Sequence, residues 1–215
     1  MSVYSEISVE NVDNISHVRN SLQPQFDFIQ SLDKEVKESL YNYTTEYGYH
    51  AELNEMLQKS IEITKPFYKK MYTDMVYCFD NSPHLLNAIT VYKGSEDPEK
   101  FTNIGFNLNY FLSTSMDSRE AMKFIEDETQ FLFVITCTPG SYSVLPLENI
   151  SESPSELEVL LPPKGKFSIQ KLVEKNDSLF NVNTIYATYI PENSVFIQNL
   201  IPDKSFWKKL TELFY

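Results

Sequence analysis

The chain has 215 residues and a formal net charge of −12, so it is long enough for one hydrophobic core and is strongly acidic. A hydrophobic fraction of 42% and an aromatic fraction of 14% are globular values and exclude an intrinsically disordered protein. The acidic balance argues against a nucleic-acid-binding surface, which needs a basic stripe, and fits either a basic partner or simple solubility.

The first part of the chain is predicted to be helical. Residues 1–25 are weakly patterned and are assigned to an N-terminal extension, and residues 26–80 form a helical lobe. A first helix begins near Ser31 and is closed by Gly48, a residue type that often ends helices. A second helix follows, and Pro66 opens a third, because proline is favoured at the first helical position.

The pattern then changes to short apolar runs separated by turns, over residues 85–200. The expected strands are residues 89–92, 110–115, 131–138, 141–146, 157–161, 167–173, 183–190 and 195–200. A short helix over residues 118–126 is capped by Asp117 or Ser118, and a C-terminal helix spans residues 203–215. Helices first and strands afterwards imply a single α+β domain over residues 1–215.

Three polar motifs lie at the ends of expected strands. One strand ends in Lys93-Gly94, a second carries Ser113-Thr114-Ser115, and a third contains Glu156-Leu157-Glu158. Because side chains alternate along a strand, the two acids are expected to point to one face. Each motif alone is more often ordinary surface or strand structure. The apolar run that follows the acids, residues 159–162, places them instead at the mouth of a buried strand.

In this order the three motifs resemble the signature of the arginine-type mono-ADP-ribosyltransferases, over roughly residues 30 to 200. The resemblance is strongest to the small single-domain phage and bacterial-toxin enzymes. It implies an ADP-ribosyltransferase-like fold, in which an N-terminal helical lobe packs on two small, mostly antiparallel sheets that bind NAD. It also implies a monomeric enzyme that cleaves NAD, releases nicotinamide and moves ADP-ribose to an exposed arginine of a partner protein.

The resemblance assigns catalysis to Glu158, Glu156 and Ser113. Cleavage of the bond between nicotinamide and ribose builds positive charge, which Glu158 would stabilise. Ser113 would orient Glu158 through a hydrogen bond. An arginine acceptor stays protonated, so Glu156 would take its proton during attack. Family members with Gln in place of Glu156 modify other acceptors, so Glu156 predicts arginine specificity. Two acids on one face should also raise the pKa of one of them.

The resemblance assigns cofactor binding to Lys93, Gly94, Ser113, Thr114, Ser115, Arg119 and Phe124. Lys93 departs from the family pattern, which has an arginine that binds the phosphates with two parallel donors. Gly94 would let the backbone approach the nicotinamide amide. Arg119 would reach a phosphate. Phe124 would stack on nicotinamide, with a core position in the short helix as its alternative.

Two other functions stay open. On the same fold, the chain is either an NAD glycohydrolase, with water as acceptor, or a catalytically degenerate binding module. The intact Ser113, Glu156 and Glu158 argue against the degenerate module, whereas Lys93 in place of arginine argues for it.

The remaining features predict no membrane segment and no metal site. Glu6 and Glu10 precede any basic residue, unlike in a secretory signal. The longest strongly apolar run, residues 131–135, is too short to span a bilayer. The two cysteines are expected to be reduced core residues, and the three scattered histidines give no metal-ligand spacing. We expect a protein that is cytoplasmic where it is made, with action inside a host cell left open.

Overall fold

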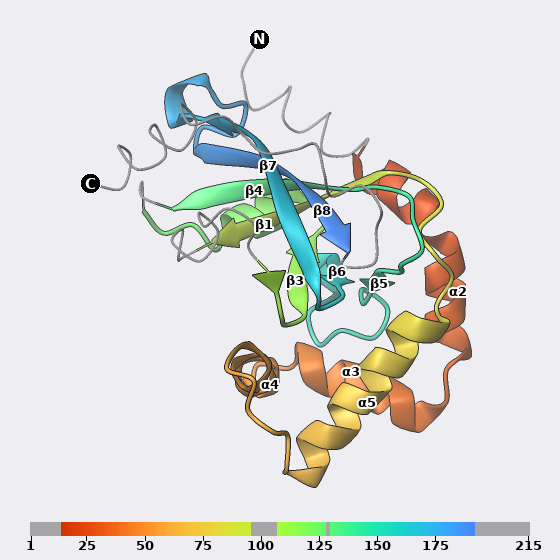
Figure 1. The fold of residues 1–215 in the computed structure, drawn as a ribbon. Helices are drawn as coiled ribbons and strands as arrows, with labels where there is room; N and C mark the ends of the chain where they lie inside the picture. Colours follow the sequence, from red (N-terminus) through yellow and green to blue (C-terminus); the bar gives the residue numbers. More distant parts are fainter. Residues whose placement is uncertain (1–13, 96–106, 128–129, 192–215) are drawn as a thin grey trace.

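A computed structural model describes residues 14–95, 107–127 and 130–191. A group of helices lies at one end of a twisted mixed sheet (Figure 1). The strands nearest to these helices are β3 (Leu112–Ser115), β5 (Leu145–Pro146) and β6 (Glu158–Leu161). The strand predicted at residues 195–200 and the helix predicted at 203–215 lie outside the described residues. So do residues 1–13.

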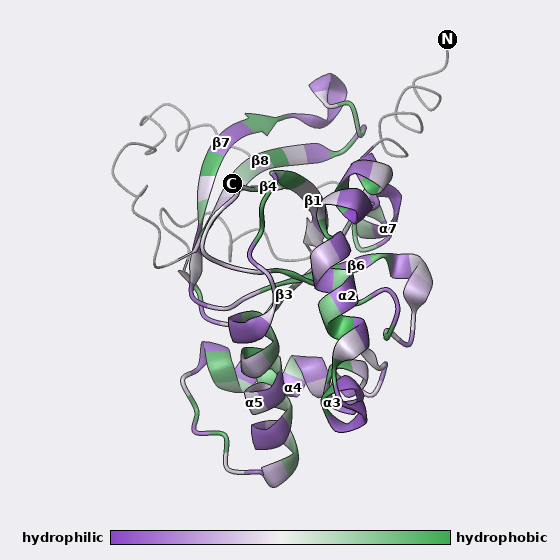
Figure 2. Ribbon diagram, turned by 90° about the vertical axis from the view of Figure 1, so that its right-hand side faces the viewer, coloured by the Kyte–Doolittle hydropathy of each residue, from purple (hydrophilic) through white to green (hydrophobic). Residues whose placement is uncertain are grey.

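The helical lobe consists of four helices after an initial helical segment at residues 14–21. These helices are α2 (Gln23–Ser31), α3 (Lys34–Thr44), α4 (Tyr49–Gln58) and α5 (Pro66–Asn81). Pro66 is the first residue of α5, as the sequence predicts, because its missing N–H costs nothing at a helix start. In Figure 2 the helices alternate between hydrophilic and hydrophobic residues along their length, as expected for helices with one buried face.

Gly48 begins α4 and does not close α3, contrary to the prediction. Helix α3, which Gly48 was expected to close, already ends at Thr44. Gly48 adopts a left-handed backbone with φ of 76°. Its carbonyl accepts hydrogen bonds from the N–H groups of Ala51 and Glu52, which are in the first turn of α4. A residue without Cβ is favoured there because the left-handed conformation carries no steric penalty for glycine.

The end of the predicted N-terminal extension belongs to the domain core. Val18 and Leu22 are fully buried in the same hydrophobic cluster as residues of the sheet. Asn14 donates hydrogen bonds of 3.1 Å to the carbonyls of Thr90 and Met116. The assignment of residues 14–25 to an extension is therefore wrong, because the helical segment packs against the sheet.

The sheet is mixed, with strands in the order β2-β7-β8-β4-β1-β3-β6-β5. The strands are β1 (Ile89–Ser95), β2 (Asn107–Leu108), β3 (Leu112–Ser115), β4 (Phe131–Cys137), β5 (Leu145–Pro146), β6 (Glu158–Leu161), β7 (Gly165–Val173) and β8 (Asn183–Pro191). Among the strands of the described ranges, β4 and β8 form the one parallel pair.

The two predicted sheets are joined. Strands β1 and β3 pair at one position, Tyr92 with Ser115. The strands therefore form a five-stranded part and a three-stranded part that meet at this narrow junction, which is where the polar motifs of β1 and β3 lie. The mostly antiparallel α+β architecture is confirmed.

A short helix, α7 (Ser118–Met122), follows β3. Asp117 caps it by accepting a 2.8 Å hydrogen bond from the N–H of Arg119, as predicted. The helix ends earlier than the predicted residue 126. It packs closely on β1, because a Cβ placed on Gly94 would lie 2.1 Å from the carbonyl oxygen of Ala121.

Two hydrophobic clusters stabilise the sheet and its contact with the helical lobe. One lies within the sheet and includes Val91, Leu112 and Val159. The other joins the helical lobe to the three-stranded part, where Phe111 and Leu160 pack among helical residues. Val159 and Leu160 are consecutive residues of β6 and belong to different clusters, so this strand is packed on both faces, which limits its movement.

Two further expectations concern the cysteines and the membrane. Cys78 and Cys137 are free and buried, as predicted, and burial raises the pKa of both thiols to about 12. Within residues 14–95, 107–127 and 130–191, no helix is long and apolar enough to cross a membrane.

Candidate active site

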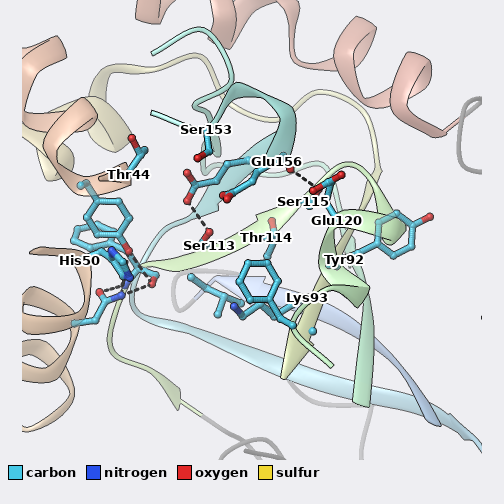
Figure 3. Close-up of a pocket in the computed structure, with 18 of the residues that line it drawn as sticks. Thr44, His50, Tyr92, Lys93, Ser113, Thr114, Ser115, Glu120, Ser153 and Glu156 are labelled. Atoms are coloured by element: carbon cyan, nitrogen blue, oxygen red, sulfur yellow. Dashed lines mark hydrogen bonds between the residues drawn. The ribbon is translucent and has the colours of Figure 1, made fainter. Parts of the chain in front are cut away.

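A pocket of about 460 Å³ lies between the helical lobe and the sheet junction (Figure 3). Its walls come from α3, α4, β1, β3, α7 and the segment that leads into β6. The predicted site residues that line it are Lys93, Gly94, Ser113, Thr114, Ser115, Phe124, Glu156 and Glu158. The fold thus brings together all but one of the predicted residues: seven come from the three motifs, and Phe124 comes from the segment after α7.

Glu158 is the first residue of β6 and is 6% exposed. Ser113 donates a hydrogen bond of 2.6 Å from Oγ to Oε1 of Glu158, the contact that the family resemblance implies. Burial raises the pKa of Glu158 to about 7, and the nearby negative charge of Glu156 adds to the rise. The hydrogen bond from Ser113 and the charge of Lys93 act in the opposite direction. This carboxyl group therefore changes charge near neutral pH.

Thr114 and Ser115 hold the acidic segment in place. Thr114 donates from Oγ1 to the carbonyl of Val159, at 2.5 Å. Ser115 donates from Oγ to the carbonyl of Glu156, at 2.6 Å, and accepts from the N–H of Asp117 at 2.9 Å. Both hydroxyls are thus bonded to backbone groups around the two acids, so their observed role is structural.

Glu156 is not part of a strand, which corrects the alternation argument. It ends a turn of 3-10 helix (η1, Pro154–Glu156), and Leu157 has a left-handed backbone with φ of 51°. Glu156 and Glu158 nevertheless line the same pocket. The break at Leu157 makes this possible, because it turns the chain immediately before β6 begins. A left-handed residue that is not glycine is uncommon and is often found at functional sites.

The pKa of Glu156 is also raised. Burial is the main cause, followed by the negative charge of Glu120, while Lys123 opposes the rise. Glu46 adds a smaller rise. Glu46 and Glu120 line the pocket but belong to no motif of the sequence, so nothing in the sequence pattern could have identified them.

Lys93 and Phe124 are neighbours in the pocket. The Lys93 Nζ lies 5.5 Å from the centroid of the Phe124 ring, a cation–π distance. Phe124 is 46% exposed, so the alternative core position is wrong. The packing of α7 requires a glycine at position 94, because a side chain there would collide with the carbonyl of Ala121. A close approach of ligand to this backbone stays a prediction.

Arg119 is the predicted residue that the fold does not bring to the pocket. Its guanidinium binds Asp117, with Nη2 at 2.7 Å from Oδ2, and it is absent from the lining. The capping role of Asp117 explains this position, because the same carboxylate accepts the backbone N–H of Arg119.

The helical lobe supplies a further wall that includes Tyr43, His50 and Asn54. The Asn54 side chain donates to the carbonyl of Phe111 at 3.0 Å and accepts from its N–H at 3.2 Å. Asn54 also donates to the Tyr43 hydroxyl at 3.0 Å. These bonds fix the start of β3 to α4. The pKa of His50 is lowered by burial and then by Lys93, which favours neutral imidazole.

Across the parts of the chain that the structure describes, no group of three or more His, Cys, Asp or Glu side chains is arranged to hold a metal ion. The chemistry available in the pocket is that of four carboxylates, a lysine, an imidazole and several hydroxyls.

A family model for NAD:arginine ADP-ribosyltransferases matches residues 16–180 of the chain. No curated protein sequence matches the chain significantly. The sequence match therefore rests on the family model.

Solved structures with the same fold include several ADP-ribosyltransferases. The toxin Plx2a from Paenibacillus larvae has a TM-score of 0.62 and 19% identity, with 83% of this chain and 96% of that chain covered. The Vis toxin from Vibrio splendidus has a TM-score of 0.58 and 16% identity, with 90% and 89% covered. Exoenzyme S from Pseudomonas aeruginosa, solved with human 14-3-3 protein beta and carba-NAD, has a TM-score of 0.61 and 13% identity, with 94% and 97% covered.

Proposed function

Because the chain belongs to the NAD:arginine ADP-ribosyltransferase family, we propose that it transfers ADP-ribose from NAD to an arginine of a partner protein and releases nicotinamide. The observation that carries this proposal is the arrangement of two carboxylates in one pocket. Glu158 is buried and held by Ser113, and Glu156 lies close enough to raise its pKa. NAD is the substrate of this family, and Exoenzyme S, one of the structural relatives, was solved bound to carba-NAD.

In the first step the bond between nicotinamide nitrogen and the ribose anomeric carbon breaks. The bonding electron pair leaves with nicotinamide, whose ring becomes neutral, and positive charge develops on the ribose. The Glu158 carboxylate stabilises this charge and accepts a hydrogen bond from a ribose hydroxyl. Because Glu158 is buried, its interaction with the developing charge is stronger than it would be in water.

Glu158 must be ionised for this step. Its pKa of about 7 means that a sizeable fraction is protonated in the free protein at neutral pH. The positively charged nicotinamide ring of bound NAD favours the ionised form, so substrate binding itself prepares the carboxylate.

In the second step the arginine acceptor attacks the ribose. Its guanidinium has a pKa above about 12 and must lose a proton as the new bond to carbon forms. Glu156 accepts this proton. Its raised pKa makes it a stronger base than an exposed glutamate, provided that it is ionised when the acceptor arrives.

Lys93 and Phe124 contribute to NAD binding in this proposal. Lys93 is the one lysine or arginine among the described residues that line the pocket, and its ammonium complements the diphosphate. Phe124 is half-exposed beside it and offers a face on which the nicotinamide ring stacks. Arg119 is left out, because it is bound to Asp117 away from the pocket.

The acceptor is proposed to be a host protein, by analogy with the toxins among the structural relatives. The net charge of −12 favours association with a basic surface. An exposed arginine on such a surface would meet the acidic side of the pocket.

The test uses the protein with labelled NAD and agmatine, a small guanidino compound, as acceptor. Arginine transfer predicts nicotinamide release together with labelled ADP-ribosyl-agmatine. Free ADP-ribose as the sole product would identify an NAD glycohydrolase, and no release under any condition would identify a degenerate binding module. Either of these results contradicts the proposed function.

A further inference from the structure

The pocket lining carries more negative charge than expected for a site that binds a dinucleotide. The described lining residues include four glutamates, Glu46, Glu120, Glu156 and Glu158, and one lysine, Lys93. NAD brings two negatively charged phosphates and one positively charged nicotinamide ring, so it does not account for four carboxylates. Glu156 and Glu158 have chemical roles in the proposed reaction, whereas Glu46 and Glu120 have none. Their negative charge favours a further cation beside the nicotinamide ring, and the second cation of the proposed reaction is the acceptor guanidinium.

Glu120 is the better placed of these two acids. It lies in α7, and its side chain is 17% exposed. Figure 3 shows Glu120 on the side of the pocket where Ser115 and Glu156 lie. Among the charged neighbours of Glu156, Glu120 has the largest effect on its pKa, ahead of Lys123, Glu46 and Lys93. This places the Glu120 carboxylate near the proposed base.

We propose that Glu120 is an acceptor-binding residue, which holds the guanidinium of the target arginine together with Glu156. The inference rests on the proposed function and names the second binding group of that site. A guanidinium has five N–H donors in one plane and can bind two carboxylates on different edges. Glu120 would anchor one edge and leave another edge for proton transfer to Glu156.

In the free protein, the proposed anchor Glu120 forms an ion pair with Lys123. The Lys123 Nζ lies 2.5 Å from Oε2 of Glu120, three residues away along the chain. The Lys123 side chain is 66% exposed, so it can leave Glu120 at little cost when a guanidinium arrives. Lys123 is thus a competitor of the acceptor. Loss of Glu120 and loss of Lys123 should therefore change acceptor affinity in opposite directions.

The experiment measures KM for agmatine and KM for NAD in four variants. Glu120→Gln should raise KM for agmatine about tenfold, because a charge-assisted hydrogen bond is lost, and should change KM for NAD far less. Lys123→Gln should lower KM for agmatine. The matched controls are Glu55→Gln and Lys59→Gln, from an exposed ion pair of 2.5 Å at the end of α4 that does not line the pocket. Both controls should behave as the unmodified protein.

Three results would overturn the inference. One is a KM for agmatine in Glu120→Gln that stays within about twofold of the unmodified protein. Another is an equal rise in both KM values, which would indicate structural damage to α7. The last is a rise in KM for agmatine in Lys123→Gln. If the unmodified protein cleaves NAD without modifying agmatine, the proposed arginine acceptor itself fails, which is a different and recognisable outcome.

Discussion

Ser113 and Glu158 are 45 residues apart in the sequence and are joined by a hydrogen bond of 2.6 Å between Oγ and Oε1. The antiparallel pairing of β3 with β6 brings them together. The hydroxyl stabilises the ionised form of a carboxyl group that burial drives toward the neutral form. The balance leaves the pKa of Glu158 at about 7, so small changes around it alter its charge at neutral pH.

NAD cleavage should therefore depend on pH in a defined way. Because the ionised Glu158 is the active form, kcat/KM for NAD should rise with pH and reach half its maximum near the pKa of about 7. Ser113→Ala should move this midpoint to higher pH, since the hydrogen bond from Ser113 lowers the pKa. Rates of nicotinamide release from about pH 5 to about pH 9 would measure both effects. A midpoint near the ordinary pKa of glutamate, unmoved in Ser113→Ala, would contradict the assignment.

Glu158 should also reduce stability at neutral pH. Its pKa is higher in the folded protein than in the unfolded chain, so the folded state binds the proton more tightly. The resulting stabilisation is complete below the ordinary pKa and is lost as the pH rises through about 7. Glu158→Gln, which stays neutral, should then exceed the unmodified protein in free energy of unfolding by up to about 3 kcal/mol at about pH 8, and by much less at about pH 5.

Urea unfolding at both pH values would measure this difference. Glu55→Gln is the control, since Glu55 is exposed and paired with Lys59 on the surface. An equal stability difference at the two pH values would show that Glu158 does not titrate as proposed.

Much of the site can be predicted from the sequence because its motifs lie at the ends or at the beginning of adjacent strands. The resemblance implies the contact between Ser113 and Glu158, and the pairing of β3 with β6 explains why they meet. Glu156 and Glu158 face the same pocket, as predicted, but the argument from alternation along a strand is wrong. Alternation cannot predict the left-handed backbone of Leu157. Such a backbone depends on contacts made after folding, which include the bond from Ser115 to the carbonyl of Glu156.

Other features could not be predicted from the local pattern. Gly48 occurs in a position where a glycine serves equally to end one helix or to begin the next, and the structure uses it for the second purpose. The resemblance assigns Arg119 to a phosphate, but the cap residue Asp117 binds its guanidinium. Glu120 lies in an ordinary amphipathic segment, and only the tertiary fold places it in the pocket.

Glu156→Gln should separate the two steps of the reaction. Transfer to agmatine should fall by roughly 10²- to 10⁴-fold, because the acceptor loses its base, while NAD hydrolysis by water should persist. Quantifying ADP-ribosyl-agmatine and free ADP-ribose from one reaction gives both rates. If hydrolysis falls as far as transfer, Glu156 is needed for NAD cleavage too and the proposed division of roles is wrong.

Lys93 should determine NAD affinity. Lys93→Ala should weaken NAD binding by at least about tenfold, because a charged hydrogen bond to phosphate is lost, whereas Lys93→Arg should bind NAD as well or better. Lys171→Ala, an exposed lysine of β7 outside the pocket lining, is the control. Calorimetric titration with NAD measures the affinities. Unchanged affinity in Lys93→Ala would exclude Lys93 from the site.

In the proposed reaction, Glu158 stabilises the positive charge formed when NAD is cleaved. The most direct measurement is the rate of nicotinamide release, without acceptor, by Glu158→Gln and by the unmodified protein at about pH 8, where most of Glu158 is ionised. Nicotinamide release should be about 10²- to 10³-fold slower in the variant, while urea unfolding shows that its fold is intact. Nicotinamide release at the unmodified rate would exclude this role of Glu158.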